Sequence, residues 1–200
     1  MPGENLTAQQ LIRKKAAGEP LETGDSGSSN QHTITVLVEN TIGAMIRVVN
    51  MFSQRGFNLE SVAVGETHDP TVSRMNIVTT GNDRVIAQIL RQLNRLVDTL
   101  EVNDLTGKAF VERELCLLKV AYKTATRAEI MDINTIFRGK VVDITLDTMT
   151  FELTGPVAKV DAFVNMMRPH GIIEVARSGR VAMTRADQKI VEPKDTSNSL

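Results

Sequence analysis

The sequence has no tryptophan, one tyrosine, six phenylalanines and a single cysteine among its 200 residues. Nucleic-acid surfaces usually combine a basic face with aromatic side chains on which bases stack, whereas this chain carries a net charge of −1. Cys116 has no partner for an intrachain disulfide, which fits a reducing compartment. No segment approaches the roughly 20 apolar residues of a membrane helix. We therefore expect no nucleic-acid partner and no membrane span.

Catalytic and cofactor-binding motifs are also missing. The three histidines, His32, His68 and His170, have no partner at the spacing of metal ligands. The sequence has no Gly-x-Gly-x-x-Gly or Walker motif and no serine or cysteine in a nucleophile-elbow context. We therefore predict no catalytic residue and no metal ligand on this chain.

The two ends of the sequence are polar. Residues 1–31 include "TGDSGSSNQ", which cannot bury enough apolar surface to order itself, so they are predicted to form a disordered extension. Residues 186–200 are predicted to be a flexible tail. An apolar content of 42% suffices for one core or two small ones in the remainder.

The first half begins with "HTITVLVE", whose alternating and β-branched residues predict a buried strand. An amphipathic helix follows, with a stripe of four apolar residues and an Arg55-Gly56 end; the stripe is Met45, Val48, Val49 and Phe52. Two antiparallel strands, "FNLESVAVGE" and "VSRMNIVTTG", precede a second helix that Asn82 or Asp83 would cap. With a last strand at "LVDTLEVNDL", the order is that of a ferredoxin-like domain, βαββαβ.

The same order returns from "VERELCLLKVAY" onward. Its first helix carries Ile130, Ile133, Ile136 and Phe137, and it too ends in Arg-Gly, with Gly139 lying 83 positions after Gly56. We predict an α+β fold with two ferredoxin-like domains in tandem, at residues 33–107 and 110–185. The alternative is that two unrelated α+β halves share only these end signals.

The junction "ENTIGAM" between the first strand and helix has two interpretations. A helix start offers unpaired N–H groups and a positive dipole end to an anion, and Gly43 would let a ligand approach. Alternatively, Asn40 or Thr41 simply caps the helix and Gly43 relieves a tight turn. The spacing alone leaves both open.

The second strand of this fold commonly lies at a sheet edge, where unpaired backbone groups invite pairing with another copy. Such pairing would bring Asn58 toward the "ENTIG" turn of a partner and create a pocket between subunits. A binding module is therefore favoured over a catalyst.

Several stretches in order resemble the regulatory (small) subunit of acetolactate synthase, also called acetohydroxyacid synthase, a family with an N-terminal ACT domain. They include "LVENTIGAMIRVVNMFSQRGFNLESVAVG", "DPTVSRMNIVTTG", "QLNRLVDTLEV", "VERELCLLKV", "FRGKVVDIT" and "IIEVARSGRVAMTR". The resemblance implies an ACT domain at residues 33–107 for effector binding and dimerisation, followed by an ACT-like domain at residues 110–185.

The resemblance also implies a function. It predicts a cytoplasmic, non-catalytic subunit that activates a catalytic large subunit and confers feedback inhibition by a branched-chain amino acid, typically valine. Thiamine diphosphate, FAD and magnesium would belong to that partner, with no cofactor on this chain. The effector would bind between the ACT domains of a homodimer, at Asn40, Thr41, Ile42, Gly43, Ala44 and Met45 of one chain and Asn58 of the other.

Two residues depart from the family pattern. Met45 replaces a common leucine and Ile46 replaces a small polar residue, which could shrink the pocket or change the effector. Two other functions compete with the regulatory subunit: a free-standing amino-acid sensor and, more remotely, an RNA-binding ferredoxin-like module.

Overall fold

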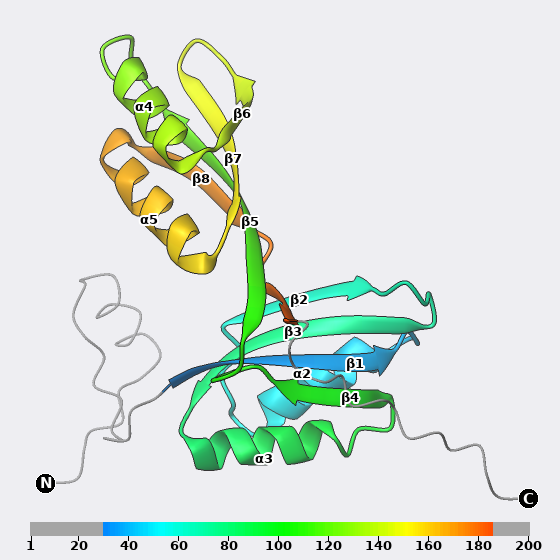
Figure 1. The fold of residues 1–200 in the computed structure, drawn as a ribbon. Coiled ribbons are helices and arrows are strands. Elements are labelled where there is room, and N and C mark those ends of the chain that lie inside the picture. The colour runs from blue at the N-terminus through cyan, green and yellow to red at the C-terminus, as the bar shows by residue number, and fades with distance from the viewer. Residues whose placement is uncertain (1–29, 186–200) are drawn as a thin grey trace, which may run out of the picture.

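Two antiparallel sheets, each covered on one face by two helices, follow one another along the chain (Figure 1). The computed structural model describes residues 30–185. The predicted extension and tail lie outside this range, except that the first strand already begins at Asn30, which pairs with Gly81. The βαββαβ order occurs twice, as predicted.

The first sheet has the strand order β2-β3-β1-β4, so β2 is an edge strand as expected. The elements are β1 (Asn30–Glu39), α2 (Ala44–Gln54), β2 (Ser61–Glu66), β3 (Val72–Gly81), α3 (Asp83–Leu93) and β4 (Thr99–Asp104). Alternation in β1 directs Ile34, Val36 and Val38 toward the helices, where Phe52 and Leu93 are fully buried. The Asn82 side chain caps α3 by accepting a 3.0 Å hydrogen bond from the Val85 N–H.

The helix α2 is rotated relative to the sequence prediction. Its buried face contains Ala44, Val48, Met51 and Phe52. Met45 and Val49, which the apolar stripe assigned to the core, are 50% and 36% exposed. The stripe was misread because the apolar residues of α2 extend around the helix onto a second, uncovered face.

The second sheet has the strand order β6-β7-β5-β8. Its elements are β5 (Phe110–Ala121), α4 (Arg127–Phe137), β6 (Lys140–Ile144), β7 (Thr148–Gly155), α5 (Val157–Met167), a 3₁₀ turn η1 (Arg168–His170) and β8 (Ile172–Arg177). Phe151 and Phe163 meet edge to face in its core, with ring centroids 6.1 Å apart.

Two details of the second unit differ from the prediction. Ile136 is 77% exposed and not part of the core stripe. At the end of α4 the left-handed residue is Arg138, with φ 55°, and not Gly139. Gly139 is needed for another reason, because a Cβ there would come within 2.3 Å of the Asn134 amide oxygen.

A further strand, β9 (Val181–Thr184), was not predicted. It pairs with the first four residues of β5, and this two-stranded ribbon lies against the face of the first sheet that the helices leave open (Figure 1). The Ala182 N–H donates a 3.1 Å hydrogen bond to the amide oxygen of Asn76 on β3. Thr33, Thr35 and Val78 on this face are at most 3% exposed. The first sheet is therefore covered on both faces.

No helix within residues 30–185 combines the length and apolar character needed to cross a membrane.

The core of the second unit gives a first prediction. Replacing Phe163 by Ala removes a fully buried ring that touches Phe137 and Phe151, and should destabilise the protein by about 3–5 kcal/mol. Ile136→Ala, at an exposed position of α4, should stay within about 0.5 kcal/mol of wild type. Urea unfolding followed by circular dichroism measures both, and equal losses would contradict this core assignment.

Candidate functional site

The junction between β1 and α2 is a tight turn that closes through main-chain hydrogen bonds. The Thr41 N–H donates to the Glu39 carbonyl at 2.9 Å and the Ala44 N–H donates to the Thr41 carbonyl at 3.2 Å. Gly43 is the residue before the helix and has a left-handed φ of 89°. A side chain is strained in this conformation, which explains the glycine.

No side chain within residues 30–185 caps α2. Neither Asn40 nor Thr41 hydrogen-bonds to its first turn, so the prediction that one of them caps the helix is wrong, whereas Gly43 does occupy a tight turn as that interpretation expects. Within residues 30–185, no acceptor is found for the N–H groups of Ile42, Gly43, Met45 and Ile46. A helix start with free donors and the positive dipole end can bind a carboxylate without a basic side chain.

Asn40 has partners on three sides. Its amide donates to the Pro70 carbonyl at 2.9 Å and to the Glu66 carboxylate at 3.2 Å, and its oxygen accepts from the Ser73 hydroxyl at 3.1 Å. This side chain therefore fixes the turn to the ends of β2 and β3. Its amide would have to release a partner before it could contact a ligand.

An ion pair holds the start of α2 from the other side. Arg47 donates to both carboxylate oxygens of Asp98, through Nε and, at 2.7 Å, through Nη2. The hydrogen bond from Arg47 is the main reason that the pKa of Asp98 lies below its ordinary value, and Thr41 adds a weaker bond. The third guanidinium nitrogen of Arg47 lies next to Gly43, where a Cβ would be 3.0 Å from Nη1. A cation thus lies directly beside the turn.

A cavity of about 480 Å³ adjoins the junction. It is lined by Glu39, Asn40, Thr41, Pro70, Thr71, Val72 and Leu100. Of the predicted effector-binding residues, only Asn40 and Thr41 line it. Ala44 is buried in the core, while Ile42 is fully exposed and Met45 half-exposed beside the cavity-forming turn.

Asn58 lies at the opposite end of the sheet. β1 and β2 both pair antiparallel with β3 and so run in the same direction, and Gln31 near the start of β1 donates to Glu60 at 2.6 Å. Asn40 follows the end of β1, roughly 30 Å away at strand spacing. Within one chain, Asn58 and the turn do not meet.

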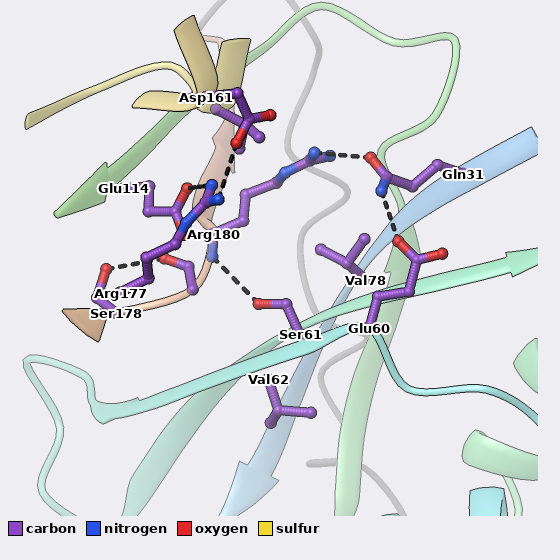
Figure 2. A pocket seen from close by; sticks show the side chains of 12 residues that line it. Gln31, Glu60, Ser61, Val62, Val78, Glu114, Asp161, Arg177, Ser178 and Arg180 are labelled. Carbon is purple, nitrogen blue, oxygen red and sulfur yellow. Dashed lines mark hydrogen bonds and ion pairs between the residues drawn. The ribbon is translucent and has the colours of Figure 1, made fainter. Parts of the chain in front are cut away.

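A larger cleft of about 510 Å³ lies between the two sheets (Figure 2). On its second-domain side, Arg177 donates to Glu114 at 2.9 and 2.5 Å and to Asp161 at 2.8 Å. Glu114 is only 5% exposed, and its hydrogen bonds are the main cause of the raised pKa of Arg177. This buried carboxylate therefore depends on Arg177 for its charge balance.

Arg180 makes the contacts across the cleft. Its guanidinium donates to Gln31 at 2.8 Å (Figure 2) and to Thr33 at 2.5 Å, both on β1. It also lies 3.0 Å from Glu112 on β5. Its backbone N–H reaches the Ser61 hydroxyl at 3.4 Å. Arg180 thus connects the ribbon of β5 and β9 to both β1 and β2.

Sequence reasoning missed Arg47, Asp98, Arg177 and Arg180. Arg47 and Asp98 are 51 positions apart, and Arg180 and Thr33 are 147 apart, so no local pattern marks either pair. The only signal was the two arginines on either side of Ser178-Gly179, in a stretch that also carries the family resemblance.

The described residues contain no group of three or more histidine, cysteine, aspartate or glutamate side chains placed to hold a metal ion. Burial raises the pKa of the Cys116 thiol, which leaves it unreactive in the core.

The Arg47–Asp98 pair gives a prediction about pH. Because the pKa of Asp98 is lowered in the folded protein, its contribution to stability is present above the unfolded carboxyl pKa of about 3.9 and is lost as the pH falls through the lowered value. Asp98→Asn should therefore melt at a lower temperature than wild type at neutral pH, with a difference that narrows in acid. Asp132→Asn, at an exposed position of α4, is the control, and a difference independent of pH would contradict the assignment.

Known proteins resemble this chain over nearly all of its described residues. Residues 34–101 match the ACT domain of acetohydroxyacid synthase (AHAS) small subunits, and residues 113–186 match the family described as the small subunit of acetolactate synthase. The acetolactate synthase small subunit of Aquifex aeolicus is 48% identical over 161 residues, which cover 80% of this chain and 83% of that protein. The isozyme 3 small subunit of Escherichia coli is 46% identical over 156 residues, covering 78% and 96%.

A solved structure agrees with these sequence relatives. The acetolactate synthase small subunit from Thermotoga maritima superimposes with a TM-score of 0.72 at 39% identity, over 78% of this chain and 98% of that one. Fold, order of matched segments and relatives agree: this chain belongs to the acetolactate synthase small subunit family of ACT-domain regulatory, non-catalytic subunits.

Proposed function

We propose that this chain forms a homodimer through its ACT domains, activates a catalytic acetolactate synthase large subunit in the cytoplasm and makes it sensitive to a branched-chain amino acid. Thiamine diphosphate, FAD and magnesium belong to the catalytic subunit in this proposal. The free donors at the Gly43 turn are the observation that carries it, because they suit the α-carboxylate of an amino acid.

The position of Asn58 supports a site shared by two chains. Two β2 edges paired antiparallel about a twofold axis would put Asn58 of one chain beside the loop after Glu66 of the other. That loop holds Asn40 through the Glu66 and Pro70 hydrogen bonds. Residues at opposite ends of one sheet thereby meet across the dimer.

The exposed face of α2 supports the same dimer. Ile42, Met45, Ile46 and Val49 follow helical spacing and are 36–102% exposed. α2 connects β1 to the edge strand β2, and the side chains of α2 that line the groove with α3 lie on another face of the helix, so this apolar face is turned away from α3. An uncovered apolar stripe on a helix and an unpaired sheet edge are each typical of a contact surface.

The three parts of an amino acid then have complementary groups. The N–H groups at Gly43 and Ile46 would bind the carboxylate, the Asn58 amide oxygen of the partner chain would accept from the ammonium group, and Met45 and Ile46 would contact the side chain. Because Ile46 is larger than the small polar residue of the family, it favours a short effector, and valine is our first choice.

Mixing the purified chain with its cognate catalytic subunit tests this function. The rate of acetolactate formation from pyruvate should rise, and valine should inhibit the mixture at lower concentration than leucine or isoleucine. An unchanged rate with intact binding of an amino acid would instead favour a free-standing sensor, which the family membership does not support.

Gly43→Asp tests the turn. Its carboxylate would compete with the effector carboxylate for the free N–H groups and pair with the adjacent Arg47, at a strained φ. We expect valine inhibition to be lost while activation remains. Gly107→Asp is the control, since Gly107 also has a positive φ but open space around it. A Gly43→Asp mixture that valine still inhibits fully would exclude the turn.

Asn58→Ala tests the contribution of the second chain. Loss of a hydrogen bond to a charged ammonium group should raise the valine concentration for half-inhibition roughly tenfold or more, since such bonds contribute about 1.5–3 kcal/mol. The comparison is Asn165→Ala, at an exposed position of α5, which should leave the inhibition curve unchanged. An Asn58→Ala curve that overlays wild type removes this residue from the site.

A further inference from the structure

The helix layer of the first domain carries an excess of arginine. Helices α2 and α3 with their flanking residues contain five arginines, Arg47, Arg55, Arg84, Arg91 and Arg95, against two aspartates, Asp83 and Asp98. The whole chain, by contrast, has a net charge of −1. The corresponding helices α4 and α5 mix both signs. The basic character is thus local to one layer of one domain.

Four of these arginines have no ion-pair partner within residues 30–185. Of the five, only Arg47 takes part in an ion pair there, with Asp98; Arg55, Arg84, Arg91 and Arg95 take part in none. Arginine is enriched in protein interfaces, where its planar group binds carboxylates through two parallel hydrogen bonds.

A groove of about 330 Å³ runs between α2 and α3 in this layer. Its polar lining consists of Arg47, Arg55, Arg95, Asn50, Gln54 and Gln92, with Met51 and Leu96 as apolar lining. Among the residues that the structure describes, none of those lining the groove carries a carboxylate, and several carry N–H donors. This donor set is complementary to carboxylate oxygens.

We infer that this arginine-lined helix layer is the surface that docks a carboxylate-rich segment of the catalytic subunit. The inference rests on the proposed function, because it needs such a partner. A protein segment fits better than a small anion, since two 11-residue helices spread the arginines over about 16 Å and Arg84 and Arg91 lie outside the groove. Val97, which follows Leu96 in the chain, is 85% exposed and adds an apolar contact.

The docking surface adjoins the proposed effector site through Arg47. One guanidinium lines the groove, binds Asp98 and lies beside Gly43. An amino-acid carboxylate arriving at the turn would therefore alter the electrostatics of the groove directly. Arg47 would in this way couple effector binding at the turn to the docking surface for the catalytic subunit.

The test uses a double charge reversal, Arg55→Glu with Arg95→Glu, in the full chain. Both side chains are exposed, and neither belongs to the proposed effector site. The concentration needed for half-maximal activation of the catalytic subunit should rise at least tenfold at low salt. Activation by wild type should weaken as the salt concentration increases. Activation by the double variant should depend less steeply on the salt concentration. For Arg55→Gln with Arg95→Gln, the concentration needed for half-maximal activation should lie between the wild-type value and that of the glutamate double variant.

The matched control is Arg127→Glu with Arg168→Glu, two exposed arginines on the helix layer of the second domain, and it should activate like wild type. The far-ultraviolet circular dichroism spectrum and the melting temperature of the isolated Arg55→Glu, Arg95→Glu chain should equal those of wild type, which controls for an intact fold. If wild type itself gives no activation, the proposed function fails. If wild type activates and the double variant activates equally well, the docking surface is wrong.

A small-anion site is the remaining outcome. Titrating the isolated wild-type chain with inorganic phosphate and with pyrophosphate should give no saturable binding. Binding that the double variant loses, while activation stays at the wild-type level, would overturn the docking surface in favour of a phosphate site.

Discussion

The structure depends on one continuous strand, β5, which takes part in both domains. Its first four residues pair with β9 over the open face of the first sheet, while residues from Glu114 onward form the centre of the second sheet. A hydrogen-bonded strand is stiff over this length. The two sheets therefore cannot reorient freely unless the hydrogen bond from Ala182 to Asn76 or the one from Arg180 to Thr33 breaks. The contacts at this junction are polar, and polar contacts exchange with water at lower cost than an apolar core. The domains are therefore joined firmly but through bonds that can be rearranged.

The pattern of apolar residues was sufficient to predict most of the fold. β1 and β3 alternate because one face of their sheet packs on helices, and that periodicity is readable from the sequence. The prediction failed where burial depends on distant segments. In β9 only Ala182 is buried, and it is buried by the other domain, so the four residues carry no periodic signal. Met45 and Val49 misled in the opposite direction, because apolar residues that lie on the surface look like core.

In the candidate site, too, only the features formed by residues adjacent in sequence could be predicted. The Gly43 turn was visible because a glycine, two small polar residues and a helix start are adjacent in sequence. Its supporting contacts were not visible: Asn40 is held by residues about 30 positions away, and the ion pair with Asp98 links α2 to the segment before β4. Local sequence thus reveals which backbone groups are free, whereas the charges around them are set by the tertiary fold.

The ribbon of β5 and β9 also decides how this sheet can associate. It crosses the face of the first sheet and does not extend either edge, so β2 and β4 keep their outer backbone groups unpaired within residues 30–185. Stacking of two sheets face to face is blocked, because helices occupy one face and the ribbon the other. Association through an edge strand remains. Pairing of edge strands fixes the relative orientation of the two subunits before any side chain makes a specific contact.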